Sequence, residues 1–297
     1  MKVGLIGLGN AGLALATPIL KIFEVTGYDR SEVRRDVARG AGVRIASSAG
    51  EVAEHCEVIF LSLPDPAISK TVLGEIGRER LAGRLVVETS TVAPQDIAEL
   101  SEIAQGGGAT VMDAAIVGGV DKLAAGKTTF LVGAAQADFE RAKPVLNAAA
   151  EEIFYLGPAG NGMRAKLINN AVAHAVMVVL VEAGALAAAQ DVPVDVFYEL
   201  MRRESGLMRP LTHRFGERIL KQDFEGGMST ANARKDSALV LDLARELGVP
   251  VFAISAAHTA YEIAMASGLG RKDYAAISKL WERWLGVSFT ATPKKSS

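Results

Sequence analysis

The sequence predicts an α/β protein whose N-terminal half is a doubly wound, mainly parallel sheet and whose C-terminal half is all-helical. Two observations lead to this prediction. Short apolar runs alternate with helical windows from residue 3 to about residue 156, a pattern typical of βαβ units. After Gly157 the alternation stops, and the chain reads as helix up to about Leu285.

Each predicted strand of the N-terminal half is a short apolar run bounded by turn residues. The strands cover residues 3–8, 23–28, 58–63, 85–88, 110–112, 129–132 and 153–156. The helical windows between them include residues 11–20, 31–41, 94–105 and 137–149. Strands that alternate with helices of this length favour a parallel sheet.

The C-terminal half is built around one long predicted helix, residues 165–190. Apolar residues lie on several of its faces, more than one small helical domain covers, so we expect burial against another subunit in a homodimer or homotetramer. Further helical windows are residues 195–203, 210–221, 231–247, 255–267 and 274–285. The predicted domains are residues 1–157 and residues 158–290, followed by a flexible tail, residues 291–297.

Composition excludes several classes of partner. The 297 residues are 49% hydrophobic and 22% charged, with a net charge of −2, so we expect a globular protein without a general nucleic-acid or anionic-membrane partner. Cys56 is the only cysteine, which excludes an intramolecular disulfide and indicates a reducing, cytoplasmic location. The apolar run 167–181 is shorter than the roughly 20 residues of a membrane span, so no transmembrane segment is predicted. The four histidines have no ligand spacing, and we predict no metal site.

A glycine-rich turn follows the first predicted strand, and it has the pattern G-x-G-x-x-G. It consists of Gly7, Leu8, Gly9, Asn10, Ala11 and Gly12. The first glycine allows a tight turn, the second lets the backbone approach a pyrophosphate, and the third lets the helix pack closely on the strand. An acidic residue, Asp29, follows about twenty residues later at the end of the next strand. This context predicts a Rossmann-type dinucleotide-binding domain.

Asp29 and Arg30 indicate different cofactors. A carboxylate at position 29 accepts hydrogen bonds from the adenosine ribose hydroxyls and repels a 2′-phosphate, which favours NAD. A guanidinium at position 30 can hold that phosphate, which favours NADP, or it is a solvated charge at a helix start. We favour NAD and keep NADP as the alternative.

A second glycine-rich turn, residues 157–162, leads into the long predicted helix. Lys166 and Asn170 lie four residues apart and therefore on one face, with Lys166 in the predicted first turn. A lysine there is unfavourable beside the positive end of the helix dipole, which suggests a functional role. Taken alone, the pair is more typical of a solvated face, and it is the rest of the chain that favours a functional role.

Four blocks in order resemble the β-hydroxyacid dehydrogenase family, which includes 3-hydroxyisobutyrate dehydrogenase and tartronate semialdehyde reductase. The resemblance covers residues 3 to about 285. The blocks are the glycine turn at residues 7–12, the D-A-A-I-V-G-G segment at 113–119, the G-x-G-x-x-x-K-x-x-x-N segment at 160–170 and the K-D pair at 235–236. Residues 88–94 are also similar to the family's S-T-x-x-P turn.

The resemblance implies roles for individual residues. Lys166 would be the catalytic acid/base, and Asn170 would hold Lys166 and the substrate. Residues near the cofactor would be Leu63, Pro64, Thr91 and Lys235. Residues near the substrate would be Val117, Gly118, Gly119, Asn170 and Lys235, with the backbone of Gly118 and Gly119 binding its carboxylate. Two departures, Ala115 for the usual Pro and Val117 for the usual Ser, put the familiar substrates in doubt.

The sequence therefore predicts an NAD(P)-dependent oxidoreductase that interconverts a small β-hydroxy acid and its semialdehyde or keto acid. The helical half is then the substrate and oligomerisation domain. Two alternatives stay open: an NADPH-dependent imine reductase of the same two-domain plan, against which Lys166 argues, and a dinucleotide-binding scaffold without catalysis.

Overall fold

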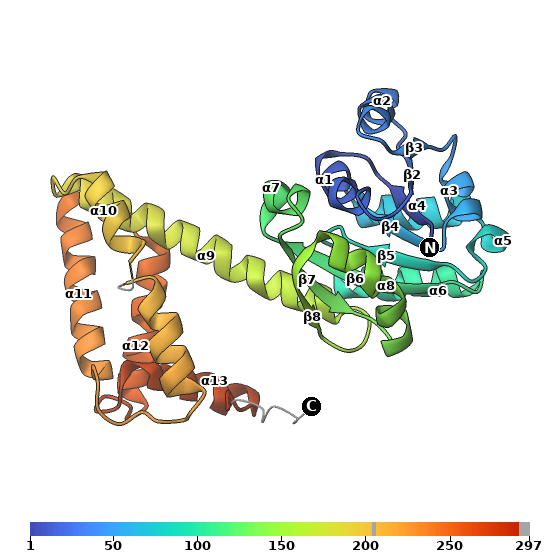
Figure 1. Cartoon of the computed structure of the whole chain (residues 1–297). Helices are drawn as coiled ribbons and strands as arrows, with labels where there is room; N and C mark the ends of the chain where they lie inside the picture. The colour runs from blue at the N-terminus through green and yellow to red at the C-terminus, as the bar shows by residue number, and fades with distance from the viewer. Residues whose placement is uncertain (204–205, 291–297) are drawn as a thin grey trace. The chain divides into compact units, whose positions relative to one another are not determined.

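The computed structural model describes residues 1–203 and 206–290 (Figure 1). The chain folds into two compact units, Met1–Ala171 and Val172–Ser297. The predicted flexible tail, residues 291–297, lies outside the described residues.

The first unit contains one eight-stranded sheet in the order β3-β2-β1-β4-β5-β6-β7-β8. All neighbouring strands are parallel except β6 and β7, which are antiparallel. The strands are β1 (Val3–Ile6), β2 (Val25–Tyr28), β3 (Arg44–Ile45), β4 (Val58–Leu61), β5 (Leu85–Glu88), β6 (Thr110–Val117), β7 (Thr128–Gly133) and β8 (Ala150–Tyr155). The order reverses between β1 and β4, and in doubly wound sheets ligands bind in the crevice at that point.

Helices cover both faces of this sheet, so the unit has three layers (Figure 1). One face packs on α1 (Asn10–Ile19), α2 (Glu32–Gly40), α7 (Gly119–Ala124) and α8 (Gln136–Ala149). The other face packs on α3 (Ala49–His55), α4 (Pro66–Ile76), α5 (Arg78–Leu81), α6 (Pro94–Gln105) and the start of α9 (Asn161–Ala189). The predicted doubly wound fold is confirmed.

The structure differs from the predicted strands and helices most clearly at β3, β6 and the start of α9. Strand β3 was not predicted, because two residues are too few to show a periodic pattern. Strand β6 continues to Val117 rather than ending at residue 112, because its second half pairs with the antiparallel β7. Helix α9 begins at Asn161, so Lys166 lies in the second turn and the prediction of a first-turn position is wrong.

The second unit is helical, as predicted. After α9 it contains α10 (Val194–Met201), a π-helical segment (Pro210–Ile219), α11 (Thr230–Leu247), α12 (Phe252–Ala266), a short 3₁₀ helix (Tyr274–Ile277) and α13 (Ser278–Leu285). Its buried apolar cluster is small, consisting of Ile219, Phe224, Ala275 and Ala276.

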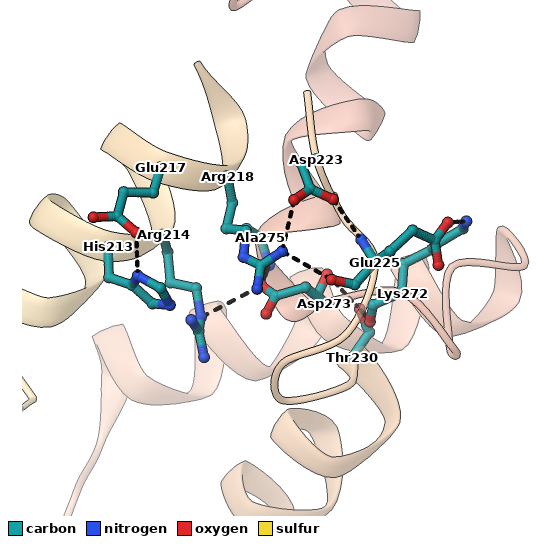
Figure 2. A network of polar contacts seen from close by, with 10 residues as sticks. All are labelled: His213, Arg214, Glu217, Arg218, Asp223, Glu225, Thr230, Lys272, Asp273 and Ala275. Atoms are coloured by element: carbon teal, nitrogen blue, oxygen red, sulfur yellow. Dashed lines mark hydrogen bonds and ion pairs between the residues drawn. The ribbon is translucent and has the colours of Figure 1, made fainter. Parts of the chain in front are cut away.

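Two buried acids of the helical unit, Glu182 and Asp273, accept hydrogen bonds from backbone N–H groups. The Glu182 carboxylate of α9 accepts hydrogen bonds from the backbone N–H groups of Phe252, Ala253 and Ile254, at 2.7, 2.9 and 3.0 Å, and so caps α12. Figure 2 shows a second network around Asp273, which is fully buried and accepts a hydrogen bond from the Ala275 N–H at 3.0 Å. The Glu182 hydrogen bonds thus connect α9 to the start of α12.

Helix α9 exposes much of its apolar surface. Ile168, Val172, Met177 and Val181 are each more than half exposed. By length and composition it is the one helix of the described residues that could cross a membrane, a test that long core helices of soluble proteins also pass. The predicted contact with another subunit is an alternative way to cover this surface.

Candidate functional site

The glycine turn between β1 and α1 has the geometry that its sequence predicts. Gly7 has φ = 94°, and a Cβ there would lie 2.1 Å from the Ser62 carbonyl oxygen. A Cβ on Gly12 would lie 2.0 Å from the Gly7 carbonyl oxygen, so the helix touches the strand backbone. Around Gly9 a Cβ would meet nothing within 4 Å, which leaves open space at the start of α1. This space suits a phosphate group at a helix N-terminus.

Asp29 connects this turn to the corner between β2 and α2. Its carboxylate accepts hydrogen bonds from the backbone N–H groups of Leu8 and Ser31, both at 2.8 Å. Leu8 itself is buried in the core, so its backbone faces Asp29 while its side chain packs inward. A carboxylate has about four acceptor positions, so two remain for ribose hydroxyls.

Basic side chains surround the same corner. Arg30 is exposed, and the exposed Arg34 donates a hydrogen bond from Nη1 to Asn10 Oδ1 at 2.8 Å, across from α2 to the glycine turn. Arg35 donates to the Asp29 carbonyl oxygen at 2.7 Å and fixes the backbone of the corner. Sequence reasoning missed Arg34, although its position one helical turn after Arg30 was a usable signal. The corner therefore presents one carboxylate and two exposed guanidinium groups.

The two loops that follow β4 and β5 are joined to each other. The Leu63 N–H donates a hydrogen bond to the Ser90 Oγ at 2.8 Å. Pro64 and Thr91 lie on these loops and are exposed, and Leu63 is half-buried. This hydrogen bond joins the two loops that carry Leu63, Pro64 and Thr91, which are predicted to lie near the cofactor.

The predicted substrate turn follows β6. Gly118 has φ = 130° and Gly119 has φ = 78°, backbone conformations that residues other than glycine rarely adopt. Val117 is half-buried, and its carbonyl oxygen accepts a hydrogen bond from the buried Thr128 Oγ1 at 2.9 Å. The turn opens α7, whose first N–H groups have no partner within the helix and could bind a carboxylate.

Lys166 and Asn170 lie on α9 within the first unit, one turn apart and both half-buried. Burial lowers the pKa of the Lys166 amine from its ordinary value of 10.5, because the ammonium form loses hydration. A lowered pKa makes more neutral amine available near neutral pH, as proton transfer requires.

A buried carboxylate fixes the start of this helix. Asp113 of β6 is fully buried and accepts hydrogen bonds from the N–H groups of Gly160, at 2.5 Å, and Met163, at 2.7 Å. Burial raises the pKa of this carboxyl, and the backbone N–H groups oppose that effect. The sequence signal for it was an acid directly after an apolar run.

Lys235 lies in the second unit, on α11. It is exposed, and its ammonium is 3.1 Å from the Asp236 carboxylate. The other predicted cofactor and substrate residues all belong to the first unit. Among the described residues no group of three or more His, Cys, Asp or Glu side chains could hold a metal ion.

Two protein families together match nearly the whole chain. The family described as "NAD binding domain of 6-phosphogluconate dehydrogenase" matches residues 2–157, and "NAD-binding of NADP-dependent 3-hydroxyisobutyrate dehydrogenase" matches residues 160–281. The chain is 31% identical to 2-(hydroxymethyl)glutarate dehydrogenase of Eubacterium barkeri, over 97% of both chains. It is 30% identical to a Dictyostelium discoideum protein described as "Probable 3-hydroxyisobutyrate dehydrogenase, mitochondrial", over 93% of this chain and 89% of that one.

A solved structure is similar over nearly the whole chain. An imine reductase from Pseudomonas sp. superposes with a TM-score of 0.85 at 21% identity, covering 94% of this chain and 99% of the other. At that identity the likeness shows the fold alone.

Proposed function

Because the chain belongs to the β-hydroxyacid dehydrogenase family, whose members bind NAD(P), we propose that it interconverts a small 3-hydroxy acid and its semialdehyde or keto acid. The observation that supports this most directly is Lys166. Its amine is half-buried, has a lowered pKa, and lies on a helix anchored to the same sheet that carries the dinucleotide turn.

Each residue has its own role in the proposed reaction. A nicotinamide cofactor held by the turn at Gly7–Gly12 and by Asp29 would supply the hydride acceptor for oxidation and the hydride donor for reduction. Neutral Lys166 takes the proton from the substrate hydroxyl at Nζ, and in the reverse direction its ammonium gives that proton to the carbonyl oxygen. Asn170, one turn along the same face, orients the amine and the substrate. Backbone N–H groups of Gly118 and Gly119 bind the carboxylate and fix the reacting carbon.

The cofactor we favour is NAD, with NADP as the alternative. Asp29 retains acceptor positions for the ribose hydroxyls, and its negative charge opposes a 2′-phosphate. Arg30 and Arg34 are exposed beside it and supply the charge that NADP would need. Initial rates with both cofactors in parallel decide between them.

Val117 limits the choice of substrate. A serine hydroxyl at this position would add a hydrogen bond, and valine presents methyl groups instead, so the substrate is less polar at that point or differently oriented. The relative of Eubacterium barkeri is described as acting on 2-(hydroxymethyl)glutarate, a 3-hydroxy acid with a further carboxylate. We therefore include branched 3-hydroxy acids and dicarboxylates among the substrates to be tested.

The test is the initial rate of nicotinamide absorbance change with a panel of 3-hydroxy acids, and with semialdehydes in reverse. Lys166→Ala is expected to lower turnover at least about a hundredfold while cofactor binding stays nearly intact. Lys127→Ala, which removes an exposed lysine of the same unit, is the matched control. Unchanged turnover in Lys166→Ala contradicts the catalytic assignment.

Two other functions share the fold. An imine reductase would reduce C=N substrates and would not depend on Lys166, and a binding scaffold would bind cofactor without turnover at any pH. Activity of the wild-type chain on imines but on no hydroxy acid would replace our proposal with the first, and silence on both with cofactor bound would replace it with the second.

We also propose a homodimer or homotetramer, located in the cytoplasm. The helical unit has a small apolar cluster of its own, while Ile168, Val172 and Val181 of α9 are each more than half exposed. Sedimentation without detergent is expected to give an oligomer, and Val181→Lys is expected to weaken it. A monodisperse wild-type monomer contradicts the assembly, and recovery with membranes after cell fractionation contradicts the location.

A further inference from the structure

Two fully buried acids lie side by side in the sheet of the first unit. Glu88 ends β5, and it is the register partner of Asp113 in the parallel neighbour β6. Neighbouring strands are about 4.8 Å apart, and register partners in a parallel pair direct their side chains to the same face. That face packs on α4 and on the start of α9.

Glu88 holds the loops that follow β4 and β5. Its Oε2 accepts a hydrogen bond from the Ser69 Oγ of α4 at 2.7 Å, and its Oε1 accepts one from the Ser90 N–H at 2.8 Å. The Ser90 Oγ in turn accepts a hydrogen bond from the Leu63 N–H at 2.8 Å. One carboxyl group therefore fixes both loops that carry predicted cofactor contacts.

Asp113 holds the helix of Lys166. Asp113 accepts two hydrogen bonds from the start of α9, and the backbone of α9 also approaches the backbone of β7 closely. A Cβ on Gly162 would lie 2.3 Å from the Leu131 carbonyl oxygen, and one on Gly133 would lie 2.5 Å from Asp113 Oδ1. Lys166 follows Met163, the last residue bonded to Asp113, by less than one helical turn.

We propose that Glu88 and Asp113 are a pair of positioning residues that fix the distance between the nicotinamide and the Lys166 amine through the β5–β6 register. Neither acid touches the substrate. Glu88 sets the cofactor side and Asp113 sets the proton-transfer side, and adjacent residues of one parallel ladder connect them. A misplacement of about 1 Å between reacting groups can cost about a hundredfold in rate, so such a connection matters for turnover.

The inference rests on the proposed function, and its test separates the two. Ser90→Ala removes the hydroxyl that joins the loops and leaves both acids in place. Asp113→Asn puts a donor where an acceptor is needed, and Asp113→Ser, which keeps one acceptor, is the second variant should the first not fold. Matched controls are Thr89→Val, which loses a buried 2.6 Å hydrogen bond in the same turn, and Asn161→Ala, at the same helix end.

Each variant is expected to change a different quantity. Ser90→Ala should weaken cofactor binding, measured by calorimetry, about fivefold or more, whereas the Asp113 variants should leave it within about twofold. The Asp113 variants should lower kcat at saturating cofactor about tenfold or more. They should also speed acylation of Lys166, followed by peptide mass spectrometry, because a loosened first turn exposes the half-buried amine.

The binding and acylation measurements need no turnover. If the wild type oxidises no hydroxy acid but these two measurements change as described, the proposed function fails and the positioning pair stands. Equal changes in all quantities for Ser90→Ala and the Asp113 variants, or changes no larger than those of the controls, overturn the inference.

Discussion

The close approach between α9 and the sheet makes Gly162 the most sensitive glycine of the predicted catalytic helix. In Gly162→Ala the new methyl group falls about 1 Å short of ordinary contact with the Leu131 carbonyl oxygen, and it also lies 2.7 Å from Asp113 Oδ2. These partners are backbone and a buried carboxylate, which cannot turn away, so the first turn of α9 must move. Overpacking of this kind costs about 1–3 kcal/mol, against a gain of about 1 kcal/mol from the helix propensity of alanine. The expected net loss of unfolding free energy is therefore at most about 2 kcal/mol.

The same substitution should lower kcat by more, in free-energy terms, than it lowers the free energy of unfolding. Lys166 lies about one turn beyond Gly162, so a shift of about 1 Å reaches the amine and lowers kcat about a hundredfold. The assay compares urea unfolding, followed by circular dichroism, with kcat at saturating cofactor. Gly74→Ala in α4 is the control, because its methyl group meets nothing within 4 Å, and it should gain about 0.5–1 kcal/mol without a change in kcat. Wild-type stability and kcat in Gly162→Ala would refute the reasoning.

Three further predictions follow from the charges. Glu182→Gln should lose about 1 kcal/mol of unfolding free energy near neutral pH, because glutamine cannot accept all three N–H groups of α12. Burial raises the pKa of Glu182, but these hydrogen bonds outweigh burial and lower it overall. The stabilisation is therefore complete above the pKa of the unfolded state and disappears as pH falls through the pKa of the folded state. A stability difference between Glu182→Gln and wild type that persists in acid, measured by thermal unfolding, contradicts this pH dependence. Hydroxy-acid oxidation should increase with pH as Lys166 loses its proton, at a pH below 10.5, and aldehyde reduction should decrease over the same range; flat rate profiles contradict the acid/base role. Asp29→Ala should weaken NAD about tenfold and NADP less, in calorimetric titrations, and equal losses mean that Asp29 does not read the ribose.

Periodicity predicted the elements that are long or strongly patterned. Strand β5 and helix α6 begin and end at the residues that the sequence indicates, because each has a clear apolar pattern and a turn residue at its boundary. The two residues of β3 carry no such pattern, and they form a strand only because β2 is beside them. The end of β6 depends likewise on β7, which follows a ten-residue connection and reverses direction.

The candidate site divides in the same way. Spacing along one helix was enough to place Lys166 and Asn170 on one face, and the glycine turn gave its own backbone geometry. The role of Asp113 was not predictable, since its partners Gly160 and Met163 are 47 and 50 residues away in sequence and meet it only when α9 docks on β6. An acid at the end of an apolar run signals only that something in the fold must satisfy it.

The anchoring of α9 also determines which mutations should affect chemistry. The first turn of this helix is held by a buried carboxylate and by close backbone contact, whereas most of the apolar stretch that follows is exposed within the described chain. In our proposal Asp113 and Glu88 set the position of Lys166 relative to the two loops that follow β4 and β5. Substitutions on the exposed faces of α9 beyond residue 172 should therefore change the proposed oligomeric state and leave the pKa of the Lys166 amine unchanged. Substitutions around Gly162 should change that pKa whether the protein is monomeric or oligomeric.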